Sequence, residues 1–591
     1  MLRSAIALAV LVGLVSPVTS QETVQVTFTA GRVEGYKLDV LGKKVDAFLG
    51  IPYAEAPVGA RRFKAPTAKA TWSAVMDAKV FGSSCAQLGM AMPPDPPALD
   101  GQEDCLFLNV WAPSPSQAGT PVLVWIHGGG YSRGTASTDD TNGKIFAAEA
   151  GVIVVSMNYR LGAMGFLALG PETAPGNVGL MDQALALQWV QDNIAAVGGD
   201  PDQVTIFGQS NGASDVGIHM MAPTSRELFK QAALQGGSAL ASWDYGTMEG
   251  GIGFANALAK KLACDVNNDG EMLTPEEVLT CISLVEIRTI LDNQEIPAGA
   301  FNTPWKPVID GTYITEDPMV SIRTGNIKKC SVLIGSNRNE AAFFVNRADG
   351  FNDTGMTPAN FVSSIKFLFP DANPFGVDAI EFEYTPWEEP ANGAGAGLRD
   401  ATVLTMTDVI FKCPGTTFAL GCAAVDQAVY FYQFGQRPSI SFWAPWMGVV
   451  HGDENNYIFG RPLDPTVVGY TDEEKEFSRM MLNHWANFAK TGDPNKAAVD
   501  DPDGPWPVYT TDQKQYLLLD ARIVNDTYDV MIGPDSQHCA FWKSYYPTLQ
   551  RKTGELDELE TDWKNQFAEW SNDITDWKDE FKKYKDGTQC D

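Results

Sequence analysis

One serine in the sequence has the neighbours of an activated nucleophile. Ser210 is the centre of Gly208-Gln209-Ser210-Asn211-Gly212, which follows the apolar run Val204–Phe207 and opens a helical stretch. In a strand–turn–helix elbow the serine has a strained backbone, and glycines two residues to either side remove side chains that would clash. The helix N-terminus behind the turn favours developing negative charge. A chain with 55 glycines also forms this pattern by accident, so it is the context that predicts a nucleophile.

A second glycine-rich turn can stabilise the negative charge that such an attack produces. His127-Gly128-Gly129-Gly130 comes directly after the predicted strand Val122–Ile126. Glycines let the backbone approach a substrate without side-chain obstruction, and an oxyanion hole needs backbone N–H donors from a second loop. We expect the N–H groups of Gly128, Gly129 and Asn211 to form this hole. A phosphate-binding loop is the alternative, but no P-loop lysine follows.

The general base should be one of the five histidines, and chain order favours His451. Hydrolases with this elbow carry their triad in the order serine, acid, histidine, and His451 lies in a loop downstream of every candidate acid. His127 belongs to the glycine loop. His219 lies nine residues after the nucleophile on the same predicted helix, about 13 Å away along the helix axis. We assign structural roles to the other two, His484 and His538.

The acid that orients the histidine should follow a strand. Ser331–Gly335 is a short apolar run of this kind, and Glu340 follows it. We expect Glu340 to bond the far ring nitrogen of His451 and to stabilise the imidazolium. Asp215, on the helix after the nucleophile, is the weaker alternative because it precedes this place in chain order. His451 then takes the Ser210 proton, Ser210 attacks an ester carbonyl, and water hydrolyses the acyl-enzyme.

Apolar runs that alternate with helical segments position these groups. Val122–Ile126, Val152–Met157 and Val204–Phe207 are β-rich runs without strict alternation, as expected for strands covered on both faces. Leu180–Val197 has helical periodicity. This β–α–β alternation predicts an α/β fold with a central, mostly parallel sheet and helices on both faces. No internal repeat or linker interrupts residues 21–548, which we expect to form one large catalytic domain.

Composition and the first residues indicate the compartment and exclude some partners. The chain has 591 residues with 43 Lys plus Arg and 73 Asp plus Glu, a formal net charge of −30, which argues against nucleic acid. Residues 1–20 have the basic, apolar and small-residue segments of a secretory signal peptide. No later run predicts a transmembrane segment. We therefore expect a secreted or extracellular protein, with glycosylation acceptors at Asn352 and Asn525.

The tail after about residue 548 has a different pattern. Its bulky residues recur with alternating gaps of four and three: Trp563, Phe567, Trp570, Ile574, Trp577, Phe581 and Tyr584. On a helix they form one narrow stripe, which favours helix–helix association. Packing back on its own domain is the alternative. We expect residues 549–591 to form an amphipathic helix that assembles dimers or tetramers, with Cys590, one of nine cysteines, in an interchain disulfide.

Together these residues resemble the type B carboxylesterase family, and within it the cholinesterases. The likeness covers nearly the whole mature chain, with the motifs in family order: Phe48–Ala54, Glu103–Leu106, the loop at His127, the elbow at Ser210, Glu340 and His451. The histidine loop Trp446–Gly452 and the tryptophan-rich tail are similar to those of cholinesterases in particular. The resemblance implies an α/β-hydrolase fold and a serine esterase that cleaves choline or related small-molecule esters. It also implies a tail that binds a proline-rich anchor protein, through which the enzyme associates with the cell surface.

The resemblance further implies disulfides and pocket residues. The cysteine pairs are Cys85 with Cys105, Cys264 with Cys281, and Cys413 with Cys539, which leaves Cys330 and Cys422 as free thiols. The acyl-pocket positions match Trp243, Phe301 and Phe344, and the gorge aromatics match Phe343 and Trp443.

Departures from the cholinesterase pattern concern the substrate's alcohol part. Cholinesterases carry a tryptophan that faces the choline cation in the loop between the first two cysteines, whereas Ala86–Asp104 contains no Trp, Tyr or Phe. Gln209 stands where the family has a glutamate, Asn211 replaces an alanine, and Thr303 falls where acetyl-selective members have a second acyl-pocket phenylalanine. A desolvated cation–π contact is worth about 2 kcal/mol, so its loss would weaken choline binding about thirtyfold. A general carboxylesterase is therefore the alternative function. A neuroligin-like adhesion protein is a further one, against which the intact triad argues.

One segment also matches a calcium-binding template. Asp265-x-Asn267-x-Asp269-Gly270-x₅-Glu276 has the spacing of an EF-hand loop. We favour the alternative, a turn followed by a helix capped by Thr274, Pro275 and Glu277, because the segment lies inside a short disulfide loop. We expect no metal and no cofactor.

Overall fold

The computed structural model describes residues 22–88, 101–298, 303–345, 351–388, 395–498, 504–525, 527–585 and 587. The predicted signal peptide (residues 1–20), Phe301 and Cys590 lie outside the described residues.

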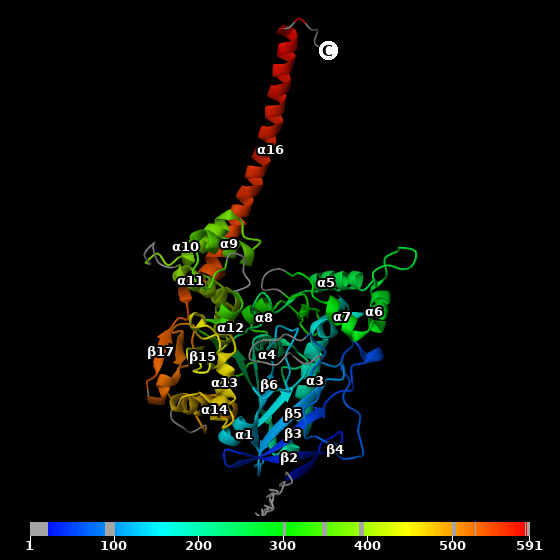
Figure 1. Ribbon diagram of the computed structural model, residues 1–591, viewed down its shortest axis with the longest axis vertical. Helices are drawn as coiled ribbons and strands as arrows, with labels where there is room; N and C mark the ends of the chain where they lie inside the picture. Colours follow the sequence, from blue (N-terminus) through cyan, green and yellow to red (C-terminus); the bar gives the residue numbers. More distant parts are fainter. Residues whose placement is uncertain are drawn as a thin grey trace, which may run out of the picture.

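A large mixed sheet forms the centre of the fold (Figure 1). Its strands are, in sheet order, β1 (Thr23–Thr27), β2 (Arg32–Val40), β3 (Lys43–Pro52), β5 (Phe107–Pro113), β7 (Ile153–Met157), β6 (Thr120–Ile126), β10 (Gly199–Gln209), β11 (Gln231–Gln235), β14 (Val332–Asn337), β15 (Val429–Phe434), β16 (Gln515–Leu519) and β17 (Asp529–Ile532), with β4 (Met76–Asp77) beside β2. From β7 to β16 all neighbours pair in parallel. The strands towards both edges of this order pair antiparallel. The predicted parallel centre is confirmed.

The central strands are apolar runs because layers of helices cover both faces of the sheet. Every residue of β7, β11 and β14 is buried. Successive side chains of β6 point to opposite faces, so Val124 joins one hydrophobic cluster and Trp125 joins the other. Helices α3 (Val178–Asn193) and α4 (Asn211–Met221) contribute to the first cluster, and α1 (Lys144–Ala150) and α14 (Asp472–Thr491) to the second.

The other elements connect and extend these layers. The further helices are α2 (Gly162–Phe166), α5 (Met248–Lys261), α6 (Pro275–Leu284), α7 (Ile287–Asn293), α8 (Pro318–Thr324), α9 (Pro358–Leu368), α10 (Pro374–Tyr384), α11 (Ala396–Thr407), α12 (Cys413–Ala423), α13 (Asp453–Ile458), α15 (Ser536–Ala540) and α16 (Tyr546–Lys585). Two small sheets pair β8 (Ala168–Gly170) with β9 (Ala174–Pro175) and β12 (Gly246–Thr247) with β13 (Val308–Ile309). A π-helical turn, Asp408–Lys412, joins α11 to α12. Among the described residues, no helix combines the length and the apolar character that crossing a bilayer requires.

The segment with EF-hand spacing folds as a turn and a capped helix. The Thr274 side chain accepts a hydrogen bond from the Glu277 N–H, and the Glu277 carboxylate accepts one from the Thr274 N–H at 2.9 Å. Pro275 occupies the first turn of α6. The carboxylate of Glu276, the last ligand position of the template, accepts from the Thr173 hydroxyl at 2.8 Å. The favoured interpretation of a capped helix is confirmed.

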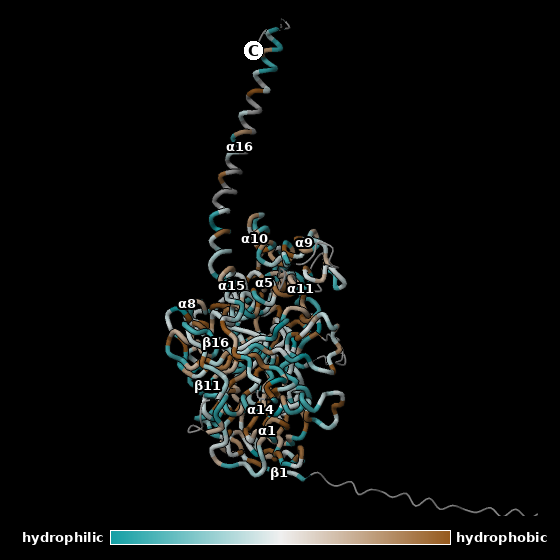
Figure 2. Tube along the Cα trace, turned by 90° about the vertical axis from the view of Figure 1, so that its left-hand side faces the viewer, coloured by the Kyte–Doolittle hydropathy of each residue, from teal (hydrophilic) through white to brown (hydrophobic). Residues whose placement is uncertain are grey.

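Helix α16 extends away from the domain, and its long projection is visible in two views (Figures 1 and 2). It begins at Tyr546, three residues before the predicted boundary. Near its start it packs on α10, where the Asn373 side chain donates to the Thr553 hydroxyl at 2.6 Å. Beyond this contact the aromatic stripe is between 51% and 75% exposed at Trp563, Phe567, Trp570, Trp577, Phe581 and Tyr584. The stripe therefore faces solvent and does not pack back on its own domain.

Candidate active site

The nucleophile candidate lies on a strained turn between β10 and α4. Ser210 has φ 61° and ψ −131°, a left-handed conformation that costs a non-glycine residue about 1–3 kcal/mol. A Cβ atom on Gly208 would lie 2.4 Å from the Gly212 carbonyl oxygen, and one on Gly212 would lie 2.2 Å from the Ile126 carbonyl oxygen. The strand–turn–helix elbow therefore requires glycine on both sides, as the sequence pattern predicted.

The glycine loop lies against this elbow. A Cβ atom on Gly128 would lie 2.8 Å from the Ser210 Cβ, so only glycine permits this approach. Gly129 and Gly130 have φ values of 124° and 62°, a region of backbone conformation that favours glycine. The Gly130 N–H donates to the Asn211 side-chain oxygen at 2.8 Å. Within the described residues the N–H groups of Gly128, Gly129 and Asn211 have no acceptor, which leaves all three free for a substrate oxygen.

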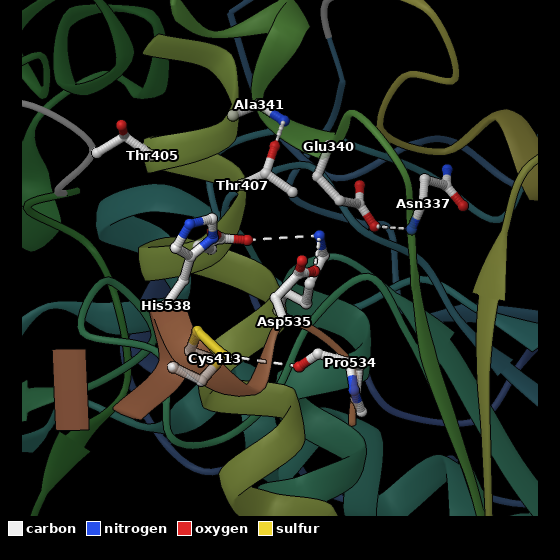
Figure 3. Close-up of polar contacts among 12 residues, drawn as sticks. Asn337, Glu340, Ala341, Thr405, Thr407, Cys413, Pro534, Asp535 and His538 are labelled. Carbon is white, nitrogen blue, oxygen red and sulfur yellow. Dashed lines mark hydrogen bonds and ion pairs between the residues drawn. A yellow bond between two sulfur atoms is a disulfide. The ribbon is translucent and has the colours of Figure 1, made fainter. Parts of the chain in front are cut away.

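His451 is bonded to Glu340. The Nδ1–H of His451 donates to Glu340 Oε2 at 2.6 Å. Glu340 is fully buried, and its other carboxylate oxygen accepts from the Asn337 N–H at 2.7 Å. The next peptide is held as well, since the Ala341 N–H donates to the Thr407 hydroxyl at 3.1 Å (Figure 3). The carboxylate is thus fixed on one ring nitrogen of the histidine and leaves the other nitrogen to accept a proton.

The alternative acid and the other histidines have different partners. Asp215 accepts from the Gln183 side-chain amide at 2.7 Å, and Gln183 also bonds His219 at 2.8 Å. Burial raises the pKa of Asp215 to about 7 and lowers the pKa of His219 to about 3. Burial also lowers the pKa of His127 to about 4. Among these groups, only Glu340 is bonded to His451.

The second ring nitrogen of His451 faces a residue that the sequence placed next to the nucleophile. Gln209 Nε2 lies 3.0 Å from His451 Nε2. Because Nδ1 donates to Glu340, Nε2 is an acceptor, and the Gln209 amide is its donor. Within the described residues Ser210 Oγ has no hydrogen bond to His451. Hydrogen bonds of a catalytic site are often long or poorly aligned before substrate binds, so the missing bond between Ser210 and His451 does not exclude this pair.

Aromatic side chains surround the histidine and extend away from it. The Phe344 ring lies 5.4 Å from the His451 ring, and the Phe411 ring lies 4.8 Å from it. Trp243 packs against Phe411 at 6.1 Å. Sequence reasoning missed Phe411, because it lies on the π-helical turn, which hydrophobic periodicity does not reveal.

These rings continue to an open cavity. Phe343 contacts Phe344 at 5.0 Å and Trp443 at 5.2 Å. Trp443 in turn lines a cavity of about 600 Å³, whose other walls include Phe351, Trp446, Asn352 and Asp353. The Arg399 guanidinium lies over the Trp446 ring at 5.0 Å. A chain of aromatic ring contacts therefore links Trp443, in the wall of this cavity, through Phe343 and Phe344 to His451.

The three predicted disulfides are confirmed. The bonds join Cys85 to Cys105, Cys264 to Cys281, and Cys413 to Cys539. Cys422 is buried and unpaired, and Cys330 is a half-buried free thiol, as predicted.

A charged cluster that the sequence did not suggest lies at the base of the tail. Asp408, Asp535 and His538 have ligand atoms within 4.8 Å of one another, and Figure 3 shows Asp535 and His538. The Lys412 ammonium lies 3.4 Å from Asp408 and contacts Asp535, so it supplies the positive charge that the carboxylates need. His538 Nδ1 bonds Asp408 at 2.8 Å, which agrees with the structural role assigned to this histidine.

A parallel sheet that carries a serine on a strand–helix turn, beside a glycine loop and a bonded histidine–glutamate pair, defines the class of α/β-hydrolases. Residues 20–542 match the carboxylesterase family. The chain is 38% identical to acetylcholinesterase of Bungarus fasciatus over 564 residues, which cover 92% of this chain and 90% of that protein. The chain belongs to the carboxylesterase family and is a carboxylic ester hydrolase. The predicted family, fold and enzyme class are confirmed.

Proposed function

We propose that the protein is a secreted, cholinesterase-like serine esterase that acts through Ser210, His451 and Glu340. The 2.6 Å bond between His451 and Glu340, beside the strained elbow of Ser210, is the observation that carries this proposal. A buried carboxylate on Nδ1 fixes the tautomer whose Nε2 accepts a proton, and this is what a general base for serine requires.

The mechanism follows from these positions. Substrate binding displaces the Gln209 amide from His451 Nε2, which then takes the Ser210 proton as Oγ attacks the ester carbonyl. The N–H groups of Gly128, Gly129 and Asn211 stabilise the tetrahedral oxyanion. His451 returns the proton to the leaving alcohol, and water hydrolyses the acyl-enzyme by the same steps.

An organophosphate tests the nucleophile directly. We expect a fluorophosphonate to modify one residue, Ser210, and to abolish turnover of a chromogenic acetate ester at the same rate, because an activated serine attacks phosphorus as it attacks carbon. Peptide mass spectrometry locates the adduct. The matched control is Ser210→Ala, which should remain unlabelled. A folded wild-type protein that takes up no phosphorus, or takes it up elsewhere, would contradict the proposal.

The acyl group and the alcohol group would lie on different sides of Ser210. Trp243 and Phe344, near His451, suit a small acyl group, as the resemblance implies for them and for Phe301. Trp443 lines the open cavity, Phe343 contacts Trp443, and both suit the alcohol. The match to acetylcholinesterase and the net charge of −30 favour a cationic alcohol such as choline.

A general carboxylesterase is the second candidate, and Gln209 is the observation that favours it. Its neutral amide bonds His451 where cholinesterases place an anion, and the Cys85–Cys105 loop offers no aromatic residue for a cation. The ratio of kcat/KM for a choline ester to that for its uncharged isostere distinguishes the two. A ratio clearly above one supports the cholinesterase, and a ratio of one or less supports the carboxylesterase.

The exposed glycosylation sequons and the disulfides support the proposal that the protein is secreted. The sequon residues Asn352 and Asn525 are both exposed, and three disulfides are the usual product of an oxidising compartment. A secreted glycoprotein would carry its sugars at these two asparagines. We propose that Cys590 adds an interchain disulfide.

We also propose that α16 assembles the protein into dimers or tetramers, with a proline-rich anchor protein as partner. Truncation after Gly554 should leave kcat unchanged and convert the oligomers to smaller species, because the exposed stripe is lost while the Thr553–Asn373 contact is kept. Sedimentation velocity measures the change. The matched full-length control replaces Trp563, Trp570 and Trp577 by alanine and should behave in the same way. Unchanged sedimentation of both variants would refute the assembly role.

A further inference from the structure

The side chain of Asn211 is fully buried, and both ends of its amide are bonded. Its oxygen accepts from the Gly130 N–H at 2.8 Å, and its nitrogen donates to the Tyr159 hydroxyl at 3.0 Å. Asn211 is also the residue directly after Ser210, and its own N–H is one of the expected oxyanion donors. One residue therefore belongs to the nucleophile elbow through its backbone and to the glycine loop through its side chain.

Tyr159 connects the same amide to the other end of the loop. Its hydroxyl donates to the His127 carbonyl oxygen at 2.7 Å. Its ring stacks on the His127 ring with the centroids 4.4 Å apart and the planes inclined by 19°. The glycine loop is thus held at His127 by Tyr159 and at Gly130 by Asn211, and these two side chains are bonded to each other.

We propose that the Asn211 side chain is a positioning residue for the oxyanion hole: it fixes the glycine loop to the nucleophile elbow, so that the loop donors and the Asn211 N–H meet one oxyanion. The inference rests on the proposed function. Because the Gly130 N–H is bonded to the Asn211 side chain, the free donors of the loop are those of Gly128 and Gly129. Within the loop His127 Nδ1 lies 2.8 Å from the Gly128 carbonyl oxygen, and the Asn211 side chain adds the link from the loop to the nucleophile elbow.

The energetic reason lies in the geometry of the transition state. Donors stabilise an oxyanion only when they lie about 2.7–3.1 Å from its position, and a displacement of about 1 Å can lower a rate about a hundredfold. Binding of the planar ester in the ground state depends less on the exact positions of the same donors. Loss of the brace should therefore lower kcat and leave KM nearly unchanged, whereas a residue that only fills space would change stability alone.

Asn211→Ala tests the inference in the full-length protein. We expect kcat for a chromogenic acetate ester to fall at least about tenfold, with KM within about twofold of wild type. The affinity for a trifluoromethyl ketone, which forms an oxyanion on Ser210, should fall by the same factor as kcat. Titration of active sites with a fluorophosphonate corrects each rate for the folded, reactive fraction. The matched control is Asn177→Ala, because Asn177 is equally buried and its amide makes two hydrogen bonds with Val308.

Tyr159→Phe provides a second variant that keeps the inference falsifiable if Asn211→Ala does not fold. It removes the hydroxyl that links Asn211 to His127, and it should lower kcat and ketone affinity in parallel. When both single variants fold, their effects should be less than multiplicative in the double variant.

Parallel losses in kcat and ketone affinity support the inference. Values within twofold of wild type, or losses equal to those of Asn177→Ala, overturn it. A wild-type protein without esterase activity would instead contradict the proposed function.

Discussion

Glu340→Gln will lower kcat by about four orders of magnitude and leave the fold intact. The Asn337 N–H, which donates to one carboxylate oxygen at 2.7 Å, will hold the oxygen of the new amide in the same place. The amide nitrogen will then face His451 Nδ1 and donate to it. This reverses the tautomer, so that Nε2 carries the proton and cannot accept the one from Ser210. An Asp→Asn change of this kind in a serine protease costs about 10⁴ in kcat.

Steady-state hydrolysis of a chromogenic acetate ester measures this loss, and circular dichroism confirms folding. The matched control is Asp215→Asn, since Asp215 is the other buried carboxylate that chain position suggested. Its bond to Gln183 does not involve His451, so kcat should stay within a few-fold of wild type. If Asp215→Asn inactivates the protein and Glu340→Gln does not, Asp215 is the acid.

Gln209→Glu will raise the preference for a choline ester over its uncharged isostere about thirtyfold. The side chain at this position lies next to the nucleophile and reaches His451, so a carboxylate there adds a charge close to the bound alcohol. At an effective dielectric constant of about 20 and a separation of about 8 Å, two opposite unit charges attract by about 2 kcal/mol. That energy corresponds to a factor of about thirty.

The readout is the ratio of kcat/KM for the two esters, measured at low and at high salt. Gln209→Met is the matched control, because it removes the hydrogen bond to His451 without adding charge and should leave the ratio unchanged. An equal rise in both variants would assign the effect to the lost hydrogen bond. No rise in Gln209→Glu would mean that the alcohol binds away from this residue.

The parts of the site that the sequence predicted are those in which local backbone geometry dictates the residue type. Gly208 and Gly212 must be glycine because other backbone atoms lie within 2.4 Å of where a Cβ would be. The apolar runs of β6, β7 and β10 identified these segments as central strands, because strands of a parallel sheet that is covered on both faces have no polar face. Chain order then ranked the candidates for the acid, and the structure bonds the preferred one, Glu340, to His451.

The parts that the sequence did not predict depend on side chains that meet through the fold. Phe411 lies on a π-helical turn and reaches His451 across 40 residues of chain. The sequence predicted a role for the Asn211 backbone N–H, but it marked the side chains of Gln209 and Asn211 only as departures from a family pattern. Their bonds to His451 and to Gly130 require three-dimensional placement, because an amide has the same donors and acceptors wherever it stands in a chain.

The disulfide at the base of the tail also determines how the protein bears mechanical load. Cys413 and Cys539 close a loop of 126 residues with their Cα atoms 5.0 Å apart. His451 lies inside this loop, and α16 begins seven residues beyond Cys539. A pulling force on the tail reaches Cys539 and passes through the covalent bond into α12, so the ends of the loop cannot separate. Without the disulfide, the same force would first separate β16 and β17 from the sheet. With the disulfide in place, the force does not act on the segment between Cys413 and Cys539, which contains His451.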